Sequence, residues 1–439
     1  MNSFFLNTDW FPNFENKAEK LRFVVLLLFV FALPFDIFYS NITFITLCAT
    51  TLVDTNLKKI KQIPKQFWLF QLIYFLTATG YFYSNHKSVA AFLLERQLLI
   101  LFFPLIIPLA VKLTDARIRF IMVSFVIATL SAICYLFASM CYSVIFVMQL
   151  PFLKTIFSGA FFNHQFSNPL NIHAGYLSLY VSLSIFHIVF LFKKASTYQT
   201  RILITFSLIV LFAGLFFLAA RNSIIATLII LLFVFPLFKI KNKIRYIAVS
   251  VSILLVSFFA ISQISYLKAR FSSALIIDIK PLAGNSNIQY QGAEPRFERW
   301  VGAFDLIKKS PLIGYGTGDE IAMLRTRYLK RELYISYLES FNAHNQYISY
   351  LIKNGILGFC VFLIAFIYYL FLAIKHRDFL YLSFLLLLLI GFYTENILDA
   401  NKGIIFFAFF NTCFGYNILM NRSPKGLASV SPHLHVKSL

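Results

Sequence analysis

The sequence predicts an all-α membrane protein with about 12 transmembrane helices and one large external loop. The 439-residue chain is 59% hydrophobic and only 13% charged, whereas a soluble domain usually has about 25% charged residues. Apolar runs also recur along almost the whole chain, and a helix needs roughly 20 such residues to cross a bilayer.

The candidate spans are apolar runs that lie between charged breaks. The first run contains Pro34, and no small-residue cleavage site follows it, so we expect it to be a retained span and not a signal peptide. The segment 141–173 is long enough to contain a re-entrant or interfacial piece. The spans lie near residues 21–39, 42–56, 66–84, 89–111, 118–140, 174–192, 201–219, 222–239, 244–262, 347–374, 378–394 and 402–420.

The distribution of basic residues predicts the orientation. If the N-terminus is cytoplasmic, the cytoplasmic segments hold 22 Lys and Arg residues and the short external loops hold four, as expected for cytoplasmic loops. Both termini are then cytoplasmic, and residues 263–346 form one long external loop. The formal charge of +21 arises from these short clusters, so we expect no nucleic-acid partner. The five cysteines lie in apolar runs without metal-ligand spacing.

Three of the arginines on the predicted external face are candidate functional residues. Arg221 lies in the tight turn "FLAARNSIIATL". A guanidinium group this close to the apolar boundary needs an anionic partner. Alternatively, Arg221 is an ordinary helix-end residue whose side chain extends to the membrane interface. Arg296 and Arg299 flank the start of a predicted amphipathic helix, "RFERWVGAFDLIKK", and could instead be solvated loop charges. The apolar face of that helix is expected to consist of Phe297, Trp300, Val301, Phe304 and Ile307.

A histidine lies at the end of the long loop, in "SFNAHNQYISYLIKNGILGF". His344 closes the loop at the mouth of the tenth span and is followed by Gly355 and Gly358. Such a histidine is often a structural hydrogen-bonding group, and the glycines could simply allow close helix packing. The glycines of "PLIGYGTGDE" lack the Lys-Ser/Thr of a phosphate-binding loop, so we interpret this stretch as a turn.

Together these motifs resemble the O-antigen ligase family, which includes O-antigen polymerases and protein O-oligosaccharyltransferases. The string His344-Asn345, nine residues, Gly355, two residues, Gly358 is similar to the family signature. "EPRFERWVGAFDLIKKSPLIGYGTG" resembles the family's Arg-x3-Trp stretch, and "AARNSIIATLIILL" resembles its arginine turn. The resemblance covers residues 160 to 420. It implies N-terminal transmembrane helices at 1–150, a catalytic region at 151–420 with a periplasmic loop at 263–346, and a cytoplasmic tail at 421–439.

The resemblance also implies a function. Family members transfer a glycan from undecaprenyl diphosphate to an acceptor hydroxyl on the periplasmic side of the bacterial inner membrane. Arginine is a permanently charged, bidentate phosphate ligand, so Arg221 and Arg296 are expected to bind the diphosphate. A histidine side chain, with an ordinary pKa near 6.5, can accept a proton near neutral pH, so His344 is expected to be the general base. We expect an inverting, metal-independent reaction without a cofactor.

Further residues are expected to bind substrate. Asn345 and Arg299 adjoin the family motifs, and His164 and His173 precede the sixth span on the external face. Arg96 lies inside the fourth span beside Glu95, and an intramembrane charge points to function or to a partner on a neighbouring helix.

The sequence leaves the acceptor open among lipid A-core, another glycan and a protein hydroxyl, with ligase-type transfer to lipid A-core favoured. A transporter of lipid-linked sugars is the competing class. It predicts polar residues near the membrane midplane and repeated halves with broken helices, whereas the polar residues here gather on one face.

Overall fold

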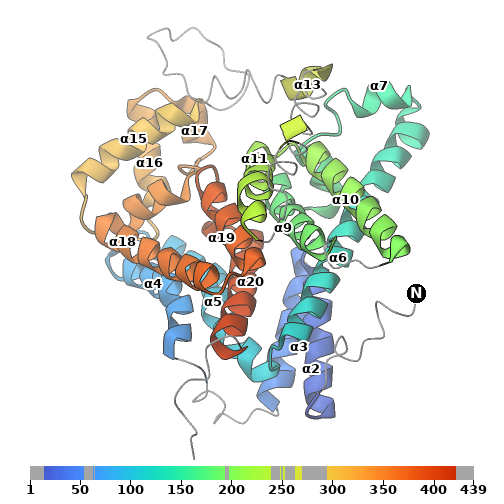
Figure 1. The fold of residues 1–439 in the computed structure, drawn as a ribbon. Helices are drawn as coiled ribbons and strands as arrows, with labels where there is room; N and C mark the ends of the chain where they lie inside the picture. Colours follow the sequence, from blue (N-terminus) through green and yellow to red (C-terminus); the bar gives the residue numbers. More distant parts are fainter. Residues whose placement is uncertain are drawn as a thin grey trace, which may run out of the picture.

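The computed structural model describes residues 14–53, 63, 65–192, 197–238, 248, 251–252, 263–268 and 294–421. Every regular element in these ranges is helical (Figure 1), which confirms the all-α class. Most of the predicted ninth span (244–262), most of the loop 263–293, and the predicted tail after residue 421 lie outside these ranges.

Within the described ranges, six helices are long and apolar enough to cross a membrane. They are α5 (Lys87–Ala110), α6 (Asp115–Tyr142), α9 (Ala174–Phe192), α10 (Tyr198–Leu218), α18 (Gln346–Lys375) and α20 (Asn401–Asn421). Shorter apolar helices are α3 (Ile37–Val53), α11 (Arg221–Ile229) and α19 (Phe379–Phe392), joined by α2 (Lys17–Ala32) and α4 (Leu72–Tyr83). The chain is thus a helical membrane protein with several spans, and the number 12 stays a prediction.

Two predicted boundaries were wrong. The first helix ends at Ala32 and not at residue 39, because Pro34 has no N–H with which to continue the helical hydrogen bonds. The second helix therefore starts early, at Ile37. The eighth span, predicted at 222–239, is confirmed: the chain is helical over Arg221–Leu237, with α11 followed by a π turn and a 3₁₀ turn that contains Pro236.

Side-chain caps explain where several helices begin. Asn16, Thr114 and Asp378 stand at the N-caps of α2, α6 and α19, and each side chain accepts a hydrogen bond from a backbone N–H of the first turn. Such a cap satisfies a donor that the helix leaves unpaired. These polar residues therefore set the helix starts at the charged breaks of the sequence.

Polar contacts gather predicted cytoplasmic segments at one end of the molecule. Arg117 pairs with Glu19 through both carboxylate oxygens, with Nη2 3.0 Å from Oε2. Asn417 Nδ2 donates to Asp115 Oδ1 over 2.9 Å. These contacts join α2, α6 and the end of α20.

Predicted external segments gather at the opposite end. Asn171 Nδ2 donates to Asp36 Oδ2 over 3.2 Å, and Lys402 Nζ donates to Leu33 O over 2.9 Å. Predicted cytoplasmic and predicted external segments thus lie at opposite ends of the helices, in agreement with the predicted order of spans. Which end faces outward stays a prediction.

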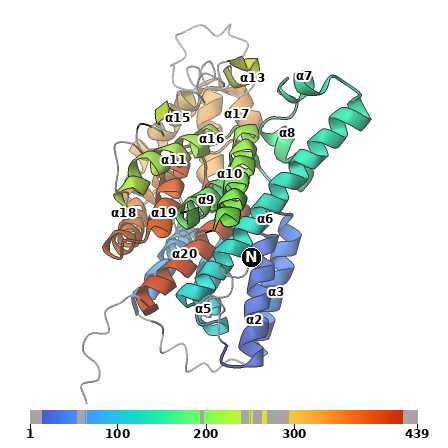
Figure 2. The ribbon, with the colours of Figure 1, turned by 45° about the vertical axis from the view of Figure 1, so that its right-hand side comes forward.

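Helix α20 lies at the centre of the bundle (Figures 1 and 2). It packs against α5, α6, α9, α18 and α19, and most of its apolar stretch is buried. Tyr180 of α9 donates a hydrogen bond to the backbone of Lys402 at the start of α20 (3.0 Å). The start of α20 is thereby fixed next to the starts of α9 and α18, where a cavity opens.

The long loop contributes α15 (Arg296–Lys309), α16 (Glu320–Lys330) and α17 (Tyr334–Leu338), which lie together beside α18 (Figure 1). Helix α15 spans the predicted amphipathic stretch from its first to its last residue. Of its predicted apolar face, Trp300 and Ile307 pack against the buried residues of this loop, whereas Phe297 and Phe304 are exposed. The buried residues are Arg299, Gly302, Ala303 and Leu306, since the small pair Gly302 and Ala303 lets α16 approach closely.

Gly355 breaks α18, with φ 61° and ψ −167°. An added Cβ would lie 2.3 Å from the backbone of Leu312, so only glycine fits this crossing. Backbone groups on both sides of the break pair with residues 311–316: Ile356 N donates to Pro311 O and Tyr315 N donates to Ile352 O, both over 2.8 Å. The glycine-containing stretch 311–318 is therefore a structural turn, as predicted.

Candidate active site

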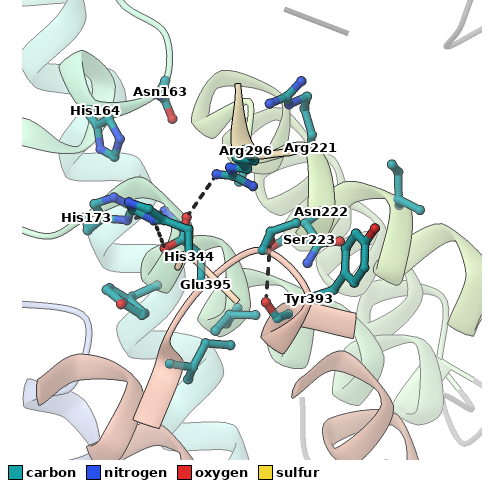
Figure 3. A pocket seen from close by; sticks show the side chains of 18 of the residues that line it. Asn163, His164, His173, Arg221, Asn222, Ser223, Arg296, His344, Tyr393 and Glu395 are labelled. Atoms are coloured by element: carbon teal, nitrogen blue, oxygen red, sulfur yellow. Dashed lines mark hydrogen bonds and ion pairs between the residues drawn. The ribbon is translucent and has the colours of Figure 1, made fainter. Parts of the chain in front are cut away.

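A cavity of about 660 Å³ opens among the starts of α9, α11, α15 and α18 and the loop between α19 and α20. Segments far apart in the sequence meet here, and every predicted segment involved is external. Figure 3 shows the ring of His344 and the carboxylate of Glu395 between the two sides of this cavity. Its polar lining includes Asn163, His164, His173, Arg221, Asn222, Arg296, His344 and Glu395.

His344 is held in an unusual backbone conformation at the cavity. Its φ is 45°, a left-handed value that is uncommon for a residue other than glycine. Its N–H donates to Asn342 Oδ1 over 2.9 Å, and Trp300 Nε1 donates to the preceding carbonyl, that of Ala343, over 2.8 Å. The turn is thus fixed from both sides, as at many functional sites.

Glu395 faces His344 and was not among the predicted site residues. Its Oε2 lies 3.5 Å from His344 Nδ1, and its Oε1 lies 3.7 Å from Arg296 Nη2. Burial acts to raise the pKa of Glu395, but the adjacent ring of His344 and the charges of Arg296 and His173 outweigh it, so the pKa lies below its ordinary value. The carboxylate is therefore charged at neutral pH and orients the imidazole.

The sequence contains a signal that could have identified Glu395. Among the predicted short external loops, only the one between the eleventh and twelfth spans contains acidic residues, namely Glu395 and Asp399. A carboxylate at the membrane boundary is costly without a cationic partner, and the predicted external arginines could supply one.

Arg221 and Arg296 both line the cavity, as the sequence predicted. Arg221 is the first residue of α11, and its N-cap residue, Ala220, has no side-chain acceptor for the first-turn N–H groups. The helix N-terminus carries a partial positive charge and commonly binds phosphate. Two guanidinium groups and the start of α11 therefore make this side of the cavity electropositive.

His164 and His173 lie together on the other side of the cavity (Figure 3). Their ring centroids are 4.1 Å apart. The backbone N–H of Gly175 donates to His173 Nδ1 over 3.1 Å, so in the neutral ring Nε2 carries the proton. His173 is thus arranged as a donor at Nε2, whereas the Nδ1 of His344 faces a carboxylate.

Three other predicted substrate-binding residues do not line this cavity. The side chain of Asn345 caps α18 and donates to Tyr393 O over 3.1 Å. Arg299 is buried, with its guanidinium 5.3 Å from the ring centre of Phe341. Arg96 donates to the backbone oxygen of Asp399 over 3.2 Å. Their contacts support the walls of the site, and direct substrate binding by them stays a prediction.

The described residues contain no group of three or more side chains suited to hold a metal ion. The side chains that line the cavity offer the chemistry of an imidazole beside a carboxylate, opposite two guanidinium groups. Such a site can take a proton from a hydroxyl and stabilise an anionic leaving group.

A family model described as O-Antigen ligase matches residues 206–363, which contain Arg221, Arg296, His344 and Gly355. No curated protein matches the chain. The match confirms the family resemblance.

Proposed function

Because residues 206–363 match a family model described as O-Antigen ligase, we propose that this protein transfers a glycan from undecaprenyl diphosphate to an acceptor hydroxyl. The family match supports glycosyl transfer of the ligase or polymerase type. The observation that carries the proposal is the convergence of His344, Glu395, Arg221 and Arg296 on one cavity. We propose ligase-type transfer to lipid A-core at the periplasmic face of the inner membrane.

The diphosphate is assigned to the electropositive side of the cavity. Guanidinium groups bind phosphate oxygens in bidentate fashion and stay charged throughout the reaction. Arg296 is shared, since its Nη2 lies 3.7 Å from Glu395, which keeps the guanidinium at the cavity in the absence of donor. As the anomeric C–O bond breaks, both bonding electrons leave with the diphosphate oxygen, and the arginines stabilise that charge.

His344 is assigned as the general base. With Nδ1–H directed at Glu395, Nε2 keeps its lone pair and takes the proton of the acceptor hydroxyl as its oxygen attacks the anomeric carbon. The imidazolium that forms is stabilised by the carboxylate 3.5 Å away. One displacement forms the new glycosidic C–O bond and inverts the anomeric centre, and the proton then passes from His344 to water.

His173 is assigned to substrate binding and not to proton abstraction. Because its Nδ1 accepts the N–H of Gly175, its Nε2–H is a donor to a sugar hydroxyl or a phosphate oxygen. The reaction needs no nucleotide, since the diphosphate linkage is already activated, and no metal ion.

Reconstituted transfer tests this function. Purified protein in proteoliposomes is given an undecaprenyl-diphosphate-linked glycan with lipid A-core, free glycan or peptide as separate acceptors, with and without EDTA. We expect glycan transfer to lipid A-core that EDTA does not reduce. Elongation of the donor glycan alone would indicate a polymerase, and transfer to peptide a protein oligosaccharyltransferase. Movement of the donor across the bilayer without any transfer would instead support a transporter.

A further inference from the structure

The segment between α19 and α20, residues 393–400, carries Glu395 and is called the Glu395 loop here. Side chains from other helices hold its backbone. Gln346 Oε1 accepts the N–H of Leu398 over 2.8 Å, and Gln97 Nε2 donates to Leu398 O over 2.8 Å. Together with the contacts of Asn345 to Tyr393 O and of Arg96 to Asp399 O, these bonds hold the loop along most of its length.

A buried lysine holds the far end of the same loop. Lys353 of α18 is 6% exposed, and its Nζ lies 2.7 Å from Asp399 Oδ2 and 3.1 Å from Glu320 Oε2. Asn396 Nδ2 donates to the same Asp399 oxygen over 3.0 Å, and Ser349 Oγ donates to Glu320 over 2.6 Å. One ammonium therefore joins α16, α18 and the Glu395 loop.

Helix α18 thus contacts the loop on both sides of Glu395. Asn345, next to His344, binds the backbone of Tyr393 before it, and Lys353 binds Asp399 after it. His344 directly precedes Asn345, the N-cap residue of α18. The contacts of Asn345 and Lys353 with the loop therefore fix the distance between the Glu395 carboxylate and the His344 ring. Lys353 itself does not line the cavity.

We propose that Lys353 is a positioning residue, which through Asp399 holds Glu395 opposite His344. A buried ion pair contributes little net stability compared with apolar side chains of similar volume, whereas it fixes the geometry of the groups that it joins. The inference rests on the proposed function. Lys353 contacts neither donor nor acceptor, so its loss is expected to lower kcat and to leave the KM for the donor nearly unchanged.

The test compares Lys353→Met with a matched control, Arg117→Met. Both substitutions break a buried ion pair, but Arg117 pairs with Glu19 at the opposite end of the molecule. Each variant is purified as a monodisperse sample and reconstituted with lipid-linked donor and acceptor, and rates are normalised to folded protein. We expect kcat to fall about tenfold in Lys353→Met, with a donor KM within about threefold of the wild type, and to change less than twofold in Arg117→Met.

A second comparison separates positioning from general stability. If Lys353 acts through Glu395, adding Lys353→Met to Glu395→Gln should lower kcat by less than about threefold further, because the effects of groups that act as a unit are not additive. The same tenfold loss in both backgrounds, or a wild-type kcat in Lys353→Met, would overturn the proposal. If Lys353→Met does not fold, Asp399→Asn serves instead, with the same expected loss of kcat.

These outcomes are distinct from failure of the proposed function. A wild-type protein that transfers no glycan to any acceptor contradicts the function itself. A wild-type protein that transfers glycan, with an Asp399→Asn or Lys353→Met variant of unchanged kcat, contradicts only the positioning role.

Discussion

Replacing Glu395 with Gln removes the negative charge that faces His344 while keeping nearly the same side-chain volume. Oε2 of Glu395 lies 3.5 Å from Nδ1 of His344, and two unit charges at that distance attract by about 5 kcal/mol at an effective dielectric constant of about 20. Because the two side chains are 28% and 29% exposed, solvent screening reduces this to ~2–3 kcal/mol.

That energy stabilises the imidazolium, which exists only after proton transfer, so its loss raises the barrier to the chemical step. Since each ~1.4 kcal/mol changes a rate tenfold, we expect kcat to fall about 30- to 100-fold with little change in donor affinity. Single-turnover transfer in proteoliposomes measures the step, and donor binding is measured separately on the same variant.

The exposed residue Glu339, which lies between α17 and α18 on the chain segment that leads to His344, provides the control. Glu339→Gln removes an equal charge from the described surface without a contact to His344, and we expect wild-type rates. A Glu395→Gln variant that turns over within about threefold of the wild type would refute the idea that this carboxylate stabilises charge on His344.

Three further outcomes are expected. Arg296→Lys and Arg221→Lys should each lower kcat/KM for the donor about 30-fold, because an ammonium keeps the charge but loses the bidentate contact; equal rates with Lys would exclude a bidentate role. Asp319 pairs with the ring of His86 and accepts hydrogen bonds from Ser84 and from the N–H groups of Asn85 and His86. Burial acts to raise the pKa of the Asp319 carboxyl, but these contacts outweigh burial and lower the pKa. The charged carboxylate therefore stabilises the folded protein above the ordinary Asp pKa, about 3.9. This stabilisation is lost as the pH falls through the folded-state pKa. Asp319→Asn should therefore lower Tm at pH 6–8, with a difference that narrows below about pH 4. Gly355→Ala should reduce the yield of folded protein, since its Cβ would meet the Leu312 backbone at 2.3 Å.

The sequence predicted the helical class, and it predicted which segments lie together at each end of the helices, because both depend on local patterns. Apolar runs and basic clusters are read within one segment, and the contacts of Glu19 with Arg117 and of Asp36 with Asn171 fit the expected sides. Both ends of helix α15 were predicted correctly, since its apolar residues recur at helical spacing between charged ones. The burial of Gly302 and Ala303 was not predicted, because their small size lets α16 approach closely, and a hydrophobicity pattern does not register small size.

The site was predicted in part for a similar reason. His344, Arg221 and Arg296 belong to motifs, and the structure brings them to one cavity. Glu395 belongs to no motif that we used, and its importance depends on a fold that places the α19–α20 loop beside the start of α18. Arg96 illustrates the opposite case, since its intramembrane charge is accounted for by a carbonyl of the Glu395 loop, a contact 303 residues away in sequence.

Proton abstraction by His344 during glycan transfer is tested most directly by single-turnover transfer with the wild type and with His344→Ala, using lipid-linked donor and lipid A-core in the same proteoliposomes. We predict rapid transfer by the wild type and a rate at least about 1,000-fold lower in the folded variant, which still binds the donor. Transfer by His344→Ala at the wild-type rate would contradict the assignment.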